Sequence, residues 1–305
     1  MLTLARASRI MLSASACIAN FNMRAAESTN QSLPIARIPL EFRHGSALVR
    51  VRVNDSKPLA FKLDTGFGVT TIHPELVETL GLKRVGTLTI TGIAGKEQAA
   101  WLSGATFDFG AATYAPRRVA AIPSDAQHNR RSRDGILGAG FFRKFVVELD
   151  PTEQVMTLHD PGQFHYTGKG EIIPLQFRRD TPIVDAAINI PGREPLLARY
   201  EIDSGCDGAL CLGHDFVKSN RLDAISGRNR AGSRTGVGGS VDTHEGRLPQ
   251  FQLGSRKLDG VDANFFREGS PVDGDLAGHI GLGVLRQFNV IFDYSRRRMI
   301  LEPAK

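Results

Sequence analysis

Short apolar or alternating segments, separated by polar turns rich in glycine, proline and aspartate, dominate the chain. The segments 47–53 and 183–190 are typical, because each is rich in apolar residues and runs directly into a polar turn. Helical periodicity is confined to two short segments, 74–81 and 215–222. The pattern predicts an all-β chain with a few short helices.

Blocks of the first half of the sequence return in the second half. The matched pairs are 38–43 with 173–178, 61–66 with 200–205, 91–95 with 235–239, 107–110 with 251–254, and 136–140 with 280–283. Because all five pairs keep the same order, the sequence predicts two copies of one β-rich unit.

The repeat divides the chain into three predicted segments: a leader-like segment, 1–32, a first unit, 33–165, and a second unit, 166–305. The leader has arginines followed by a short stretch of apolar and small residues, which resembles a secretory signal. We expect export to the periplasm or envelope, with an undocked tail as the alternative. No other segment approaches about 20 apolar residues, so we expect no membrane span beyond the leader.

Charge adds little evidence for a nucleic-acid partner. The 38 basic and 32 acidic residues give a formal net charge of +6. The basic residues gather at 130–133 and 296–298, without interleaved aromatic residues. Such clusters are typical of solvated loops, and a nucleic-acid-associated factor would need a continuous positive face.

Histidine and cysteine spacing indicates neither a metal site nor a disulfide framework. His73 and His214 stand at the expected helix starts, where capping or surface packing is the usual role. Cys206 and Cys211 would lie about 16 Å apart in an extended chain, so only a tight turn would bring them within bonding distance. We expect two free, largely buried thiols and no metal ion.

An aspartate ends an apolar strand in each predicted unit, at Asp64 and Asp203. A carboxylate in that position is costly unless it finds water or a partner. If the units pack about a pseudo-two-fold axis, the two carboxyl groups meet and share one proton. Such a pair can take a proton from water and donate one to a carbonyl oxygen.

The residues after each aspartate suit this arrangement. Gly66 and Gly205 permit a tight turn and close backbone approach. Thr65 and Ser204 each supply a hydroxyl that can reach the backbone of the opposite unit. One Asp-Thr-Gly alone is an ordinary strand exit, but two copies within repeats favour a paired site.

The motifs at 63–66 and 202–205, with the later signatures 134–138 and 278–281, resemble those of the pepsin and retropepsin superfamily of aspartic peptidases. The similarity is greatest to bacterial two-lobed members built from tandem retropepsin-like units. It covers roughly residues 35–304.

The resemblance implies a pepsin-like bilobal fold, in which two homologous β-barrel-like lobes carry short helices. It implies that Asp64 and Asp203 are the catalytic pair of an endopeptidase acting on a peptide or protein substrate. No metal or organic cofactor is implied. Because one chain carries both aspartates, a monomer is expected to suffice for activity.

In that family, a mobile hairpin called the flap closes over the substrate. The glycine-rich segments 91–95 and 235–239 occupy the corresponding places. The flap candidates are Gly92, Ile93, Gly95, Gly236, Val237 and Gly239. Ordinary surface turns without substrate contact are the alternative interpretation.

The sequence departs from the pepsin pattern at Phe67 and Cys206, where pepsin-type enzymes have Ser or Thr. Fewer hydrogen bonds to the charged carboxylate make the pair less acidic, so we expect optimal activity at weakly acidic to neutral pH. Phe67 also leaves open a second function, a catalytically silent pepsin-fold protein that binds peptides or proteins.

Overall fold

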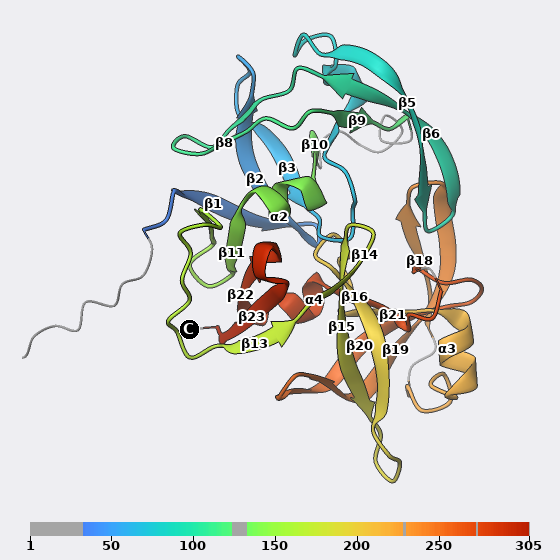
Figure 1. The fold of residues 1–305 in the computed structure, drawn as a ribbon. Helices are drawn as coiled ribbons and strands as arrows, with labels where there is room; N and C mark the ends of the chain where they lie inside the picture. Colours follow the sequence, from blue (N-terminus) through green and yellow to red (C-terminus); the bar gives the residue numbers. More distant parts are fainter. Residues whose placement is uncertain (1–32, 124–132, 228–229, 273, 305) are drawn as a thin grey trace, which may run out of the picture. The chain divides into compact units, whose positions relative to one another are not determined.

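The computed structural model describes residues 33–123, 133–227, 230–272 and 274–304. The predicted leader, 1–32, and part of the basic cluster at 130–133 lie outside the described residues. The described chain consists of strands with a few short helices, which confirms the all-β prediction (Figure 1). Contacts join both halves into one compact unit, so the division between 165 and 166 stays a prediction.

The larger sheet contains 15 strands of the described residues, and its path passes from one half of the chain to the other. In spatial order the strands are β13 (Glu171–Pro174), β23 (Arg298–Pro303), β22 (Phe288–Asp293), β11 (Val146–Asp150), β12 (Val155–His159), β1 (Ala36–Arg43), β2 (Ser46–Val53), β3 (Leu59–Leu63), β10 (Gly135–Leu137), β4 (Thr71–Ile72), β9 (Val119–Ala121), β6 (Gly95–Ser103) and β5 (Lys83–Gly92), with β7 (Phe107–Asp108) and β8 (Thr113–Tyr114) beside β2.

The smaller sheet contains eight strands of the described second half, and its edges approach each other because β15 also pairs with β19. In spatial order the strands are β14 (Gln176–Arg178), β15 (Thr181–Asn189), β16 (Leu196–Asp203), β21 (Gly278–Gly281), β17 (Leu210–Leu212), β20 (Arg256–Phe266), β19 (Gly239–Leu253) and β18 (Arg230–Gly236).

The helices within the described residues are short. They are η1 (Pro74–Leu76), α2 (Ala139–Lys144), α3 (His214–Ser219), α4 (Leu282–Leu285) and η2 (Tyr294–Arg296). The segment expected as a helix at 74–81 forms only the 3₁₀ turn η1, after which the hydrogen bonds have irregular spacings of four, three and five residues. None of the helices in the described ranges has the length and apolar content that a membrane crossing requires.

The two aspartate-bearing strands have the same neighbours. Strand β3, which precedes Asp64, lies parallel to β10, and β10 is antiparallel to β4. Strand β16, which ends at Asp203, lies parallel to β21, and β21 is antiparallel to β17. Each aspartate therefore leaves its strand beside a second strand that carries a glycine signature.

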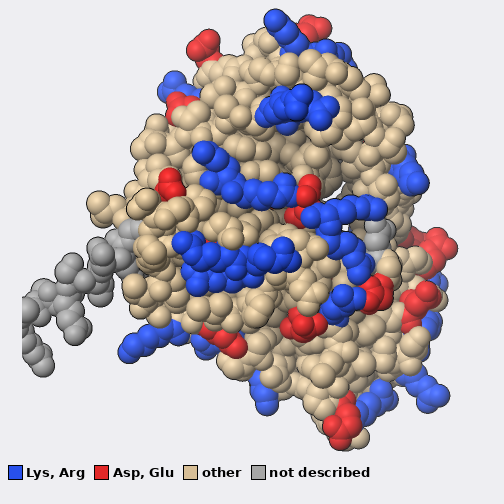
Figure 2. Space-filling model, in the orientation of Figure 1, with Lys and Arg blue, Asp and Glu red and all other residues tan. Residues whose placement is uncertain are grey.

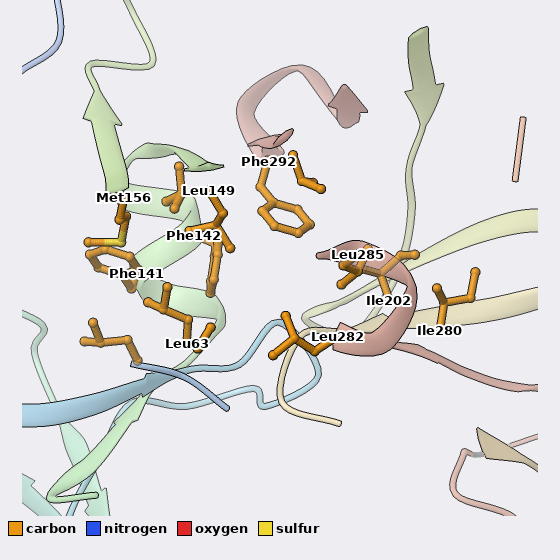
Figure 3. Close-up of a cluster of buried hydrophobic side chains, with 14 of the residues drawn as sticks. Leu63, Phe141, Phe142, Leu149, Met156, Ile202, Ile280, Leu282, Leu285 and Phe292 are labelled. Carbon is orange, nitrogen blue, oxygen red and sulfur yellow. The ribbon is translucent and has the colours of Figure 1, made fainter. Parts of the chain in front are cut away.

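Strands from both halves meet where β11 pairs antiparallel with β22. One hydrophobic cluster also crosses this junction, and Figure 3 shows part of it, with Leu63 and Ile202 among side chains of both halves. Leu63 and Ile202 each directly precede an aspartate and are fully buried. Since successive side chains of a strand point to opposite faces, burial of these residues directs the following aspartates away from the core.

Candidate active site

Four hydrogen bonds join the two aspartate turns. The Thr65 hydroxyl donates to the Ile202 carbonyl oxygen at 2.7 Å and accepts from the Ser204 N–H at 2.9 Å. The Ser204 hydroxyl donates to the Leu63 carbonyl oxygen at 3.1 Å and accepts from the Thr65 N–H at 3.0 Å. Both residues are completely buried, so every bond is shielded from water. The exchange fixes the two turns against each other.

The glycines of the turns lie against the opposite carboxyl groups. A Cβ atom added at Gly66 would come within 2.7 Å of the Asp203 Cγ, and one added at Gly205 would overlap the Asp64 carboxyl group. Asp203 lies close enough to Asp64 to raise the pKa of that carboxyl group. The structure thus brings together all six dyad residues that the sequence singles out: Asp64, Thr65, Gly66, Asp203, Ser204 and Gly205.

The backbone that follows each glycine signature is hydrogen-bonded to one of the aspartate turns. The Ala139 N–H, at the start of α2, donates to the Phe67 carbonyl oxygen at 2.9 Å. The Leu282 N–H, at the start of α4, donates to the Cys206 carbonyl oxygen at 2.8 Å. A side chain at Gly138 would collide with this backbone contact, because an added Cβ would lie 2.5 Å from the Phe67 carbonyl oxygen. These helices were not predicted from the sequence.

Asp64 is 7% exposed, and the Lys62 Nζ lies 3.8 Å from its Oδ2. Burial and the adjacent Asp203 raise the pKa of Asp64 to about 7, although Lys62 acts in the opposite direction. Among the described residues, no backbone N–H donates to the Asp64 carboxyl group. Asp64 therefore holds a proton under mildly acidic conditions.

Asp203 has a different environment. Its Oδ1 accepts hydrogen bonds from the N–H groups of Gly205, at 2.9 Å, and Cys206, at 3.2 Å. Its Oδ2 lies 3.1 Å from the Nδ1 of His279, on β21. Asp203 thus has two backbone donors and an imidazole ring beside it, whereas Asp64 has no backbone donor among the described residues. The two carboxyl groups of the pair are consequently unequal.

The repeat pairing of 136–140 with 280–283 set Ile280 against Ile136, so His279 was not singled out from the sequence, although the 278–281 signature contains it. In the structure Ile136 pairs with Lys62, and His279 pairs with Glu201. His279, not Ile280, therefore occupies the place of Ile136. A polar residue inside an otherwise apolar signature was the signal that could have found it.

Among the described residues, His279 belongs to a group of three side chains whose chemistry could bind a metal ion. Ligand atoms of Asp203, Cys206 and His279 lie within 4.8 Å of one another. However, the His279 Nδ1 is already paired with Asp203, and the Cys206 Sγ contacts the Cys211 Sγ at 3.1 Å. Ion pairing and a sulfur contact account for the proximity, and we interpret the group as a hydrogen-bonded network.

Both cysteines carry free thiols, as expected, but a tight turn brings them together. The chain folds back between Cys206 and β17, which begins at Leu210. The hydrogen bond with Cys211 and burial raise the pKa of the Cys206 thiol well above its ordinary value. At neutral pH the sulfur is therefore a thiol rather than a thiolate.

A cavity of about 650 Å³ lies above the pair. Both aspartates line it, together with Phe67 and Cys206, so the bulky ring borders the cavity and does not fill it. Residues from both sheets line the cavity. An arrangement of this kind suits an extended ligand placed across two acidic groups.

Two hairpins cover the cavity, and their tips touch (Figure 1). The β5–β6 hairpin and the β18–β19 hairpin each turn through two residues. The Ala94 N–H donates to the Val237 carbonyl oxygen at 3.3 Å, and Val237 also packs against Gly92. Of the flap candidates, Gly92, Ile93, Gly236 and Val237 line the cavity. Gly95 and Gly239 instead supply positive φ at the hairpin turns and are not among its lining residues.

Basic side chains gather across the middle of the face shown in Figure 2, with acidic side chains among them. Arg234, on the cavity wall, pairs with Asp207 at 2.9 Å. Arg178, also on the wall, pairs with Asp275 at 2.6 Å. Charges of both signs therefore occur along the cavity.

Residues 49–141 match the model of a family described as aspartyl protease. The matched segment contains Asp64, the β5–β6 hairpin and the Gly135–Leu137 strand, which are the elements assembled above. Comparison with curated proteins gives no match. The family match, on a mostly β fold, supports an aspartyl protease of the pepsin and retropepsin type.

Proposed function

We propose that this protein is an aspartic endopeptidase that hydrolyses peptide bonds with a water molecule activated by Asp64 and Asp203. The observation that carries the proposal is the reciprocal Thr65–Ser204 hydrogen bonding, which holds the two aspartate turns together while both aspartates line one cavity. An aspartate with a purely structural role would not need a second, matched aspartate at the same cavity.

The unequal environments assign the roles. Ionised Asp203 takes a proton from the water, and the hydroxide equivalent attacks the scissile carbonyl carbon. Protonated Asp64 donates its proton to the carbonyl oxygen as the tetrahedral intermediate forms. Because the pKa of Asp64 is about 7, this acid is available at weakly acidic to neutral pH.

The substrate is a peptide in extended conformation, bound below the two hairpins. Strand-like pairing with the hairpin backbones would hold it, and Ile93 and Val237 at the tips would contact its side chains. This binding mode uses the cavity, the glycines at the tips and the paired carboxyl groups together.

We propose further that the chain is a two-lobed enzyme of tandem units, 33–165 and 166–305, active as a monomer and exported. Support for the tandem arrangement comes from the matched strand neighbours of β3 and β16. Support for export comes from the signal-like composition of 1–32, which lies outside the described residues.

The test is cleavage of a peptide library by the full chain from pH 3 to 8, with the Asp64→Asn and Asp203→Asn variants alongside. We expect either substitution to abolish cleavage, while Asp223→Asn, an exposed partner of Lys218, leaves it unchanged. Cleavage that survives both dyad substitutions would contradict the proposal. Peptide binding without cleavage at any pH would instead indicate the silent binding protein, with Phe67 at the cavity wall as the first residue to replace.

A further inference from the structure

The two aspartate-bearing strands have equivalent neighbours, but the residue pairs that lie two positions before each aspartate differ between the two halves. Beneath Asp64, strand pairing places Lys62 opposite the apolar Ile136. Beneath Asp203, the same pairing places Glu201 opposite His279. An anion and a titratable ring in the second half thus replace a cation and an aliphatic side chain in the first.

Both ring nitrogens of His279 face carboxylates. Nδ1 lies 3.1 Å from the Asp203 Oδ2, and Nε2 lies 3.8 Å from the Glu201 Oε1. The side chains of His279 and Glu201 are only 10% and 13% exposed. A neutral imidazole has one N–H and would present a lone pair to one of the two carboxylates, whereas the imidazolium presents an N–H to both.

We propose that His279 is a positioning residue whose imidazolium, held between Glu201 and Asp203, keeps Asp203 ionised and so places the shared proton of the pair on Asp64. This inference rests on the proposed function, because it assigns the base and the acid within that site. It adds a residue type that an aspartate pair does not itself require.

The other charges around the ring act in the same direction. From β16, Glu201 and Asp203 favour the imidazolium. From the turn, the Cys206 sulfur lies within 4.8 Å of a ring nitrogen, and on β17 Cys211 is the strand partner of His279. Across the cavity, Lys62 and Arg133 act on Asp64. Burial alone lowers the pKa of His279, but Asp203, Cys206 and Glu201 raise it to about 10. The ring therefore stays charged over the whole range in which Asp64 titrates.

A first experiment is independent of cleavage. The imidazole and carboxyl resonances of the full chain are followed by NMR from pH 5 to 9 in the presence of EDTA, with His279→Gln identifying the ring. In the wild type, we expect His279 to stay protonated through pH 8. In Asp203→Asn, we expect it to titrate near its ordinary pKa. At pH 6 in the wild type, we expect Asp64 rather than Asp203 to carry the proton.

The inference would be overturned by an ordinary titration of His279 in the wild type, by no response of the ring to Asp203→Asn, or by a proton found on Asp203. A ring signal that changes when EDTA is omitted would indicate a bound metal instead of the ion pair and would equally contradict it. Because none of these measurements needs turnover, they remain decisive if the peptidase proposal fails.

A second experiment uses the pH profile of kcat/KM. His279→Gln removes a cation beside Asp203, so we expect the acidic limb to move up by roughly one to three pH units. Lys62→Met is the matched control, because it removes a cation beside Asp64 and should move the alkaline limb instead. Equal loss at every pH in His279→Gln would show a merely structural role. If His279→Gln does not fold, Glu201→Gln is measured instead. Because this variant removes one of the two carboxylates that hold the imidazolium, the acidic limb of the pH profile should again move to higher pH.

Discussion

Thr65 and Ser204 exchange hydrogen bonds across the junction of the two halves, so that each residue is both donor and acceptor for the opposite turn. The relationship is reciprocal, with lengths between 2.7 and 3.1 Å. Since both residues are fully buried, neither turn can replace these bonds with water. The distance between the two carboxyl groups therefore depends on this exchange.

Thr65→Val keeps the shape of the side chain and removes its hydroxyl. The Ser204 N–H and the Ile202 carbonyl oxygen lose a partner, so the free energy of unfolding should fall by about 1–3 kcal/mol. Chemical denaturation measures this, and peptide cleavage should fall with it. Thr89→Val, at an exposed position of β5, is the control and should change stability by less than about 0.5 kcal/mol. Equal effects at both positions would contradict the role assigned to the exchange.

Gly205→Ala should abolish cleavage, because the new methyl group would occupy the place of the Asp64 carboxyl group. Gly68→Ala is the control for folding, since its Cβ would meet nothing nearer than 3.9 Å. Thermal unfolding of both variants, together with cleavage by Gly205→Ala, checks the prediction. An active Gly205→Ala enzyme would mean that the turns lie farther apart than described here.

The titration of Asp64 makes stability depend on pH. Its pKa is about 7 in the folded chain and 3.8 ordinarily, so the folded state binds the proton more tightly. The stabilisation is fully present below about pH 4 and is lost as the pH rises through 7. We expect denaturant midpoints to fall over this interval, with a smaller fall in Asp64→Asn. The same slope in both proteins would assign the effect to other groups.

Cys206 and Cys211 should form a disulfide on treatment with diamide, since their sulfurs are 3.1 Å apart. The reaction should be slow at pH 7 and faster at higher pH, because the raised pKa of Cys206 keeps it protonated and the thiolate is the nucleophile. Mass spectrometry after alkylation measures the bond, and Cys211→Ser should prevent it. We expect lower cleavage after oxidation, because the Cys206 N–H donates to Asp203. Unchanged activity of the oxidised protein would show that Asp203 keeps its position when the two sulfurs move together to form the bond.

Several features of the site follow from local patterns in the sequence. The strands at 47–53 and 183–190 appear as β2 and β15, since apolar residues with polar turns define them locally. The pairing of Asp64 with Asp203 could be anticipated because similar local motifs recur in the same order. Roles in catalysis and the division into units stay predictions.

Other features depend on contacts between residues remote in sequence. The chain by itself determined an all-β fold with two aspartate turns, because strand alternation and Asp-Thr/Ser-Gly motifs are encoded over a few adjacent residues. Only the tertiary structure decided that the hairpin tips touch, that two cysteines meet, and that His279 lies between Glu201 and Asp203. These arrangements depend on strand register and on packing in a water-poor interior, where burial and neighbouring charges shift the pKa of a carboxyl group.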